Sequence, residues 1–401
     1  MSEVQPLSGI RVIDFTQVFA GPFASFQLSL LGADVIKIED PRGGDILRGY
    51  AHGGDGMGGM GGSFIAINSG KKSVALNLKD PDALAIAKRL IAGADVLIEN
   101  FRAGVLDRLG LSWAACKEIN PRLVYVTLSG FGPDGPLKDF PAYDHTMQAM
   151  SGMMLLNGEE GADPLKVGFP VIDTFAGYVA GFATLAGLAQ RNQTGDGQFI
   201  DVAMLDASLV LMTSMVIPYL NAGTEPPRLG NRGYSTSPTS DLFETGDGTL
   251  SLGANTQDQY ERLCRAIGAE DLTTDPRFAT REARGENAAA LRDALTRVLA
   301  GKPATEWEVI ISAERVPAAK VRSVMESCAH PQLANRNLFQ WLPMSRNDDR
   351  RIRVMNSGFR SDFNGAQQPS PMLGEHTAAI LNDLGVPSEV LEALRARGAA
   401  R

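Results

Sequence analysis

The sequence has few of the residues that build disulfide frameworks and metal sites. It contains three cysteines and four histidines in 401 residues. Cys116, Cys264 and Cys328 are odd in number and widely spaced, and none is flanked by a second ligand at metal-binding spacing. The histidines show no metal-binding spacing either. We therefore expect free thiols in a reducing compartment and no metal site.

Positive charge is also scarce. The chain has 38 Lys and Arg against 46 Asp and Glu, a formal net charge of -8. A surface that binds nucleic acid needs a net or strongly clustered positive field, so nucleic acid is not expected as a partner. An anionic ligand would have to meet a local cluster of basic residues.

No secretory leader is expected, because MSEVQPLSGIRVIDF has no basic region followed by an apolar stretch. The most apolar segments are 171–190 and 202–220, and each is interrupted by an acid, Asp173 or Asp206. These features favour a cytoplasmic enzyme with buried helices and no membrane partner.

Two familiar enzyme motifs are missing or incomplete. No G-x-S-x-G occurs, which disfavours an α/β serine hydrolase. The glycine cluster at 53–62 contains G-x-G-x-x-G at Gly54, Gly56 and Gly59, but no strand precedes it and no helix N-terminus follows directly. Glu39 ends the second predicted strand, which is the position of the ribose-binding acid in dinucleotide sites. A loop is favoured over an NAD site.

What the chain does contain is a long alternation of strand and helix patterns. Strands are predicted at 10–15, 34–39, 72–78, 95–101, 123–129 and 198–202, and helices at 21–31, 80–90, 145–155 and 174–192. Asp80 and Ser112 are predicted helix caps. This spacing is typical of a parallel sheet covered on both faces.

The chain is too long for one compact core, so two or more domains are expected. Beyond an apolar helix to about residue 220, the stretch TEPPRLGNRGYSTSPTS lacks periodicity. A hairpin turning at Asp247-Gly248 and three helices then predict a smaller α+β domain. The expected division is a large domain over 1–205, a linker over 206–235, a small domain over 236–325, a linker over 326–350, and a return to the large domain over 351–401.

Several ordered segments together resemble the class III coenzyme A (CoA) transferases, which include formyl-CoA transferase, carnitine-CoA transferase and the α-methylacyl-CoA racemases. The matching stretches are PLSGIRVIDFTQVFAGPFAS, LLGADVIKIEDPRGGD, NSGKKSVALNLKDP, DVLIENFRAGVLDRLGL, NPRLVYVTLSGFGPDGP, TGDGQFIDVAMLDA, VPAAKV, HPQL and LGEHT. The resemblance implies a Rossmann-like α/β large domain made from both chain ends, a small inserted domain and an interlocked homodimer. It implies CoA transfer between carboxylic acids, with acyl-CoA as a substrate and no permanently bound cofactor.

By this resemblance, Asp173 is the catalytic aspartate. A carboxylate with a reference pKa of about 3.9 is ionised at neutral pH, and a helix N-terminus is expected to keep it so. It could attack an acyl-CoA thioester without a base, while Val171, Ile172 and Phe175 exclude water from the resulting anhydride. From the residues alone, a helix cap is the favoured reading of Asp173, and capping is compatible with catalysis.

The resemblance also supplies a CoA site. It places Asn100, Phe101 and Arg108 along CoA, and Val18, Phe19 and Ala20 beside the pantetheine and acyl group. Formyl-CoA transferases tend to have Gln where Phe19 stands, so a less polar acyl environment is expected here. The phosphates require basic residues near strand ends. The candidates are Arg42, Lys71, Lys72, Arg102 and Arg108, and the choice between Lys71 and Lys72 stays open.

Tyr143 matches an active-site tyrosine of the transferases, where the racemases carry a histidine. A tyrosine is a poor acid or base for racemisation. Asp144 is a possible helix cap, and His145 keeps an acyl-CoA racemase or epimerase as an alternative. A non-catalytic CoA-binding protein is a second alternative.

Arg228 or Arg232 is a hypothetical partner for the second carboxylate of a dicarboxylic substrate.

Overall fold

The computed structural model of the chain describes residues 4–50, 60–345, 348–361 and 368–401. Gly54, Gly56 and Gly59 of the glycine cluster lie outside the described residues. The chain divides into two compact units. Unit 1 comprises Met1–Ser151, Val167–Ile217 and Pro331–Arg401, and unit 2 comprises Gly152–Lys166 and Pro218–His330.

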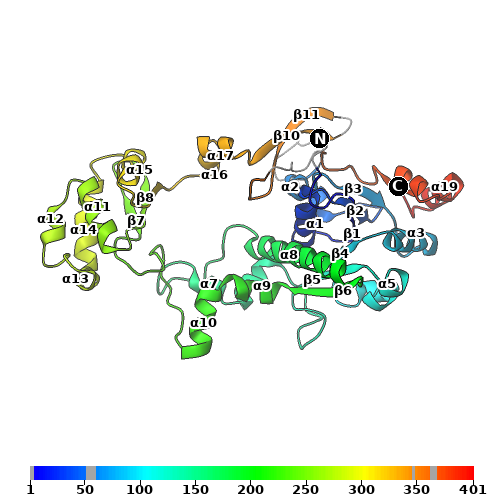
Figure 1. The fold of residues 1–401 in the computed structure, drawn as a ribbon, viewed down its shortest axis with the longest axis horizontal. Coiled ribbons are helices and arrows are strands. Elements are labelled where there is room, and N and C mark those ends of the chain that lie inside the picture. Colours follow the sequence, from blue (N-terminus) through cyan, green and yellow to red (C-terminus); the bar gives the residue numbers. More distant parts are fainter. Residues whose placement is uncertain (1–3, 51–59, 346–347, 362–367) are drawn as a thin grey trace. The chain divides into compact units, whose positions relative to one another are not determined.

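Unit 1 is built on a six-stranded sheet in the order β3-β2-β1-β4-β5-β6 (Figure 1). The strands are β1 Arg11–Asp14, β2 Asp34–Glu39, β3 Lys72–Ala75, β4 Val96–Glu99, β5 Val124–Ser129 and β6 Gln198–Ala203. All neighbouring pairs are parallel. This confirms the predicted parallel sheet, and its strand order is that of the doubly wound Rossmann fold.

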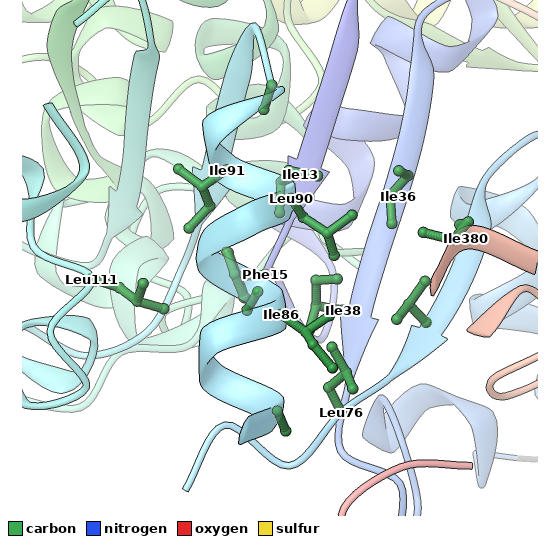
Figure 2. Packing of buried hydrophobic residues seen from close by; sticks show 14 of the residues in the cluster. Ile13, Phe15, Ile36, Ile38, Leu76, Ile86, Leu90, Ile91, Leu111 and Ile380 are labelled. Atoms are coloured by element: carbon green, nitrogen blue, oxygen red, sulfur yellow. The ribbon is translucent and has the colours of Figure 1, made fainter. Parts of the chain in front are cut away.

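One face of the sheet is covered by helices from both ends of the chain. They are α3 Pro81–Ala92, α5 Trp113–Ile119, α18 Thr377–Asp383 and α19 Ser388–Ala396. Figure 2 shows Ile86 and Leu90 of α3 facing the strands that carry Ile13 and Ile36, with Ile380 of α18 at the side. The side chains of Asp80 and Ser112 cap α3 and α5, as predicted.

Helices α1 Ala20–Leu30 and α8 Val171–Thr194 pack against each other and contact strands of the sheet. A Cβ on Gly177 would lie 2.6 Å from the carbonyl oxygen of Ala20, so this glycine permits the close approach of α8 to the start of α1. By length and composition α8 could also cross a membrane, but 44% of its apolar window is buried inside the protein. Its packing is that of a core helix.

The C-terminal residues attach through the backbone to β3 and to the segment that follows it. His376 N–H donates to the Ser73 carbonyl at 2.9 Å, and Asn77 N–H donates to the Ala399 carbonyl at 2.9 Å. The other elements of unit 1 connect and flank this sheet. They are the 3₁₀ helix η1 Ile46–Arg48, helices α2 Gly62–Asn68, α4 Val105–Arg108, α6 Asp144–Met150, α9 Met204–Leu211 and α17 Pro331–Arg336, and the antiparallel pair β10 Phe339–Ser345 and β11 Asp348–Met355.

Unit 2 has its own hydrophobic core. Its elements are α7 Met153–Leu156, β7 Leu242–Glu244, β8 Thr249–Leu252, α11 Gln257–Ala266, α12 Asp271–Thr274, α13 Arg281–Glu286, α14 Ala288–Leu299, α15 Ala304–Ala313, β9 Ala318–Lys320 and α16 Val324–Cys328. β7 and β8 form the antiparallel hairpin predicted around Asp247-Gly248.

The two segments expected to be linkers contain regular structure. In 206–235, α9 continues to Leu211 and α10 spans Thr213–Ala222, and the boundary between the units falls inside α10. In 326–350, α16 ends, α17 follows, and β10 pairs with β11. The stretch rich in Pro, Gly, Ser and Thr that suggested a linker begins at Thr224, shortly after α10.

Candidate active site

A cavity of about 260 Å³ lies at the carboxyl edge of the sheet in unit 1. It is lined by the loop after β1, the loop after β4, the loop after β5 and the first turn of α8. Eight residues that the sequence assigned to the site line it together, namely Val18, Phe19, Ala20, Asn100, Phe101, Arg102, Tyr143 and Asp173. The parallel topology accounts for this gathering, because the carboxyl ends of parallel strands meet at one edge.

Asp173 is the third residue of α8, whose N-cap is Pro170. Its own side chain therefore does not cap the helix. The carboxylate of Asp144 does so instead: its Oδ1 accepts from Ile172 N–H at 2.7 Å and from Asp173 N–H at 3.1 Å. The reading of Asp173 as a helix cap is thus wrong, and the cap comes from α6.

Asp144 is itself held in place by a buried glutamine. Gln148, which is fully buried, donates from Nε2 to Asp144 Oδ2 at 2.6 Å. Gln148 Oε1 accepts from Val167 N–H at 2.8 Å. These bonds fix the carboxylate of Asp144 against the start of α8.

Burial raises the pKa of Asp173 to about 7, and the neighbouring carboxylate of Asp144 adds to the shift. The expectation that the helix terminus keeps Asp173 fully ionised therefore does not hold. The two N–H groups that could have stabilised its charge donate to Asp144 instead. Asp173 is an acid poised to change its protonation near neutral pH.

Tyr143 precedes α6, is 62% exposed and lines the cavity. Its ring stacks on that of His145, with the centroids 6.3 Å apart. His145 is exposed beside this tyrosine. The structure thus places the tyrosine, the residue typical of the transferases, at the cavity wall.

A second cavity of about 460 Å³ shares Gln17 and Phe101 with the first. Arg108 and Lys79 line it, together with Asp40. Asp40 forms a 2.6 Å ion pair with the exposed side chain of Arg42. The two cavities are therefore neighbours at the carboxyl edge of the sheet.

Lys71 and Lys72 do not belong to these cavities. Lys71 is buried, with Nζ 3.1 Å from Asp14 Oδ2 and donating to the Pro22 carbonyl at 2.8 Å. Lys72 begins β3 and pairs with Asp34 at the beginning of β2, which is the amino edge of the sheet. Neither side chain is placed to bind a phosphate in the cavities.

The two arginines proposed for a substrate carboxylate both lie in unit 2. The guanidinium of Arg228 donates to the carbonyls of Asn157, Ala162 and Asp163, so it stabilises a loop of its own unit. Its assignment to a substrate carboxylate does not hold. Arg232 is exposed, and its Nε donates to the Leu229 carbonyl at 3.3 Å.

Two cavity lysines were missed from the sequence. Lys79 follows β3 and lines the second cavity, and Lys138 follows β5 and lines the first. Both come after the carboxyl ends of strands, which is the signal that could have identified them. Within the ranges that the structure describes, no group of three or more His, Cys, Asp or Glu side chains could hold a metal ion.

The model of CoA-transferase family III matches residues 7–377. The chain belongs to CoA-transferase family III. It is 36% identical over 389 residues to the succinate–glutarate CoA-transferase of Agrobacterium fabrum, covering 94% of this chain and 96% of that protein. It is 37% identical over 388 residues to the acetyl-CoA:oxalate CoA-transferase of Acetobacter aceti, covering 95% and 96%.

A crystal structure of a CaiB/BaiF family protein from Brucella suis matches with a TM-score of 0.86. It is 32% identical in sequence, and the match covers 95% of this chain and 100% of that chain. The chain is accordingly a family III CoA-transferase that uses CoA thioesters and carboxylic acids as substrates.

Proposed function

We propose that this CoA-transferase moves CoA from an acyl-CoA to a dicarboxylic acid through covalent intermediates on Asp173. The observation that carries the proposal is the position of Asp173, which lines one cavity with Tyr143 and with the loop Val18, Phe19 and Ala20. Its pKa of about 7 leaves a large fraction of the carboxylate ionised at neutral pH.

In the first half of the reaction, a carboxylate oxygen of Asp173 attacks the thioester carbonyl. The C–S bond breaks, an acyl–aspartyl anhydride forms and CoA thiolate leaves. The thiolate then attacks the Asp173 carbonyl carbon, which gives an aspartyl-CoA thioester and releases the first acid as its carboxylate. The acceptor carboxylate reverses these steps and leaves with CoA.

Water has to be kept away because an anhydride hydrolyses readily. Ile172 is fully buried beside Asp173, and Val171 and Phe175 are partly buried. Holding the thiolate next to the anhydride can give effective molarities on the order of 10⁵ to 10⁸ M, which favours its return over attack by stray water.

The two neighbouring cavities suggest how CoA lies. Arg108 and Lys79 in the larger cavity suit the phosphates, and Arg42, which pairs with the lining residue Asp40, stays a candidate. Asn100 and Phe101 line the smaller cavity together with Asp173. Val18, Phe19 and Ala20 would then flank the thioester. Arg102 and Lys138 supply positive charge at the smaller cavity.

The acceptor class rests on the names of two relatives, because succinate, glutarate and oxalate are dicarboxylic acids. Arg232 stays our candidate for the second carboxylate, since its side chain is exposed and Arg suits bidentate carboxylate binding. A normal rate with dicarboxylates in Arg232→Ala would count against this residue. Tyr143 at the cavity wall favours transfer over racemisation, and retention of the α-proton in deuterated water would support that choice.

The decisive experiment is trapping of the intermediate during turnover. Borohydride or hydroxylamine should modify Asp173 only when acyl-CoA is present, as seen by peptide mass analysis. Asp144→Asn is the matched control, because it should still be modified at Asp173, whereas Asp173→Asn should not be. Modification at another residue, or full activity in Asp173→Asn, would refute the mechanism.

We further propose an interlocked homodimer that acts in the cytoplasm. Support comes from apolar side chains on the outer face of α8, where Tyr178, Phe182 and Leu185 are 44%, 74% and 36% exposed. A face of this kind on a core helix indicates a covered surface. Native mass spectrometry should give twice the chain mass, and resistance of the dimer to dilution would fit interlocked chains.

A further inference from the structure

The loop after β1 contains a residue in an unfavourable backbone conformation. Val18 has a φ of +66°, in the left-handed region that a β-branched residue rarely adopts. Such a conformation persists where the surrounding structure holds it, and it concentrates at functional sites. Val18 lines the cavity that contains Asp173.

The buried ion pair of Asp45 and Lys37 contacts the backbone of Val18. Val18 N–H donates to Asp45 Oδ1 at 3.2 Å, and the same oxygen accepts from Leu47 N–H at 3.0 Å. Asp45 Oδ2 lies 3.1 Å from Lys37 Nζ. Asp45 is 1% exposed and Lys37 is fully buried, so neither can meet a substrate.

The same pair and one cavity residue hold the preceding part of the loop. Lys37 Nζ donates to the Thr16 carbonyl at 2.6 Å. Asn100 bonds both backbone groups of Gln17, accepting from its N–H at 2.7 Å and donating to its carbonyl at 2.8 Å. The path of the loop into Val18 is thus fixed by side chains from β2, from the residue before η1, and from the end of β4.

The position of the loop matters for the reaction because α8 packs on it closely. Ala20 O would lie 2.6 Å from a Cβ on Gly177, one turn after Asp173 on the same helix. A shift of the loop would therefore change the distance between its backbone groups and the Asp173 carboxylate.

We propose that the buried Asp45–Lys37 pair is a positioning device that keeps Val18 in the left-handed conformation and so sets the cavity wall facing Asp173. The pair acts through the backbone of residues 16–18 and touches no substrate. The proposal rests on the proposed reaction at this cavity.

The test is a kinetic comparison of Asp45→Asn with wild type and with Asp95→Asn. Asp95 likewise accepts a backbone N–H, from Arg11, and pairs with Arg191, but it lies at the amino edge of the sheet. Asp45→Asn should lower kcat roughly 10- to 100-fold and change the KM for acyl-CoA less than about threefold, since misplacement of reacting groups acts on the chemical step. Asp95→Asn should lower the melting temperature and leave kcat unchanged.

Val18→Gly provides a second arm, because glycine adopts positive φ without steric cost. In the Val18→Gly background, Asp45→Asn should cost less than about threefold in kcat. If Asp45→Asn does not fold, Asp45→Glu keeps the charge but moves the carboxylate from Val18 N–H, and it should show the same kcat loss.

An unchanged kcat in folded Asp45→Asn, or an equal loss in both Val18 backgrounds, would overturn the proposal. Trapping separates this result from the proposed reaction. If wild-type enzyme carries no label at Asp173, the nucleophile is wrong whatever Asp45 does. If the label is present and kcat of Asp45→Asn is normal, only the positioning role is wrong.

Discussion

Two carboxyl groups of unit 1, the buried Asp14 and the partly buried Asp173, have pKa values shifted in opposite directions. Burial alone would raise the pKa of Asp14, but the ammonium groups of Lys71 and Lys37 and bonds from two hydroxyls lower it to about 2. Burial raises the pKa of Asp173 to about 7, and its charged neighbour, Asp144, is another acid. The difference separates a carboxylate that stabilises the fold from one available for chemistry.

The two acids also affect stability with opposite signs. The pKa of Asp14 is lower in the folded state, so its contribution is present above about pH 4 and is lost as the pH falls toward 2. The pKa of Asp173 is higher in the folded state, so folding takes up protons between about pH 4 and 7 and stability falls as the pH rises through that window. A reactive acid therefore costs stability at the pH where it works.

The largest expected effect comes from replacing Asp173, the acid with the raised pKa. We expect Asp173→Asn to lower CoA transfer by at least about 10³-fold, because no other group would form the anhydride. Its stability should equal or exceed that of wild type at pH 7, since the variant buries no charge. Exchange of labelled acid into acyl-CoA and thermal unfolding measure the two effects. Activity above a tenth of wild type would remove Asp173 from the reaction.

The opposite result is expected at Asp14. Asp14→Asn leaves the buried ammonium of Lys71 without its carboxylate and should lower the free energy of unfolding by about 3 to 5 kcal/mol. Urea unfolding at pH 7 measures this loss. The double variant Asp14→Asn/Lys71→Met should recover part of it, and a loss below about 1 kcal/mol in the single variant would show that the pair is not a stabilising element.

The pH dependence of the reaction sharpens the comparison further. Because Asp173 attacks as the carboxylate, kcat/KM should rise with pH through about 7. Asp144→Asn removes the like charge and should move this limb to lower pH by on the order of half a unit. The exposed acid Asp82 provides the control, because Asp82→Asn should leave the limb in place. A limb near pH 4 in wild type would contradict the desolvated environment of Asp173.

The sequence predicted the features that depend on local patterns. The parallel sheet follows from strand and helix periodicity, the caps at Asp80 and Ser112 from residue type, and the hairpin from Asp247-Gly248. The gathering of eight site residues in one cavity follows from the resemblance and from the edge at which parallel strands end.

What the sequence could not supply is long-range pairing. The cap of α8 comes from Asp144, which lies 28 residues before Ile172 in the chain, so Asp173 looked like the cap of its own helix. Lys71 looked like a candidate for the CoA phosphates, because nothing local shows that it pairs with Asp14, 57 residues away, and is buried. The role of a charged residue therefore depends on partners distant in the sequence, which the neighbouring residues do not reveal.

A further expected effect, on binding, separates lysines at the two edges of the sheet. Lys79 follows β3 and lines the larger cavity, whereas Lys72 begins β3 and pairs with Asp34. Lys79→Ala should raise the KM for acyl-CoA about three- to tenfold, as expected for one lost charge-assisted phosphate contact, while Lys72→Ala should leave it unchanged. An acyl-pantetheine substrate, which lacks the nucleotide phosphates, should react equally with both variants. If Lys79→Ala still raised the KM for acyl-pantetheine, Lys79 would shape the cavity and would not bind phosphate. The contrast between Lys72, which pairs with an acid, and Lys79, which would contact the ligand, would then be wrong.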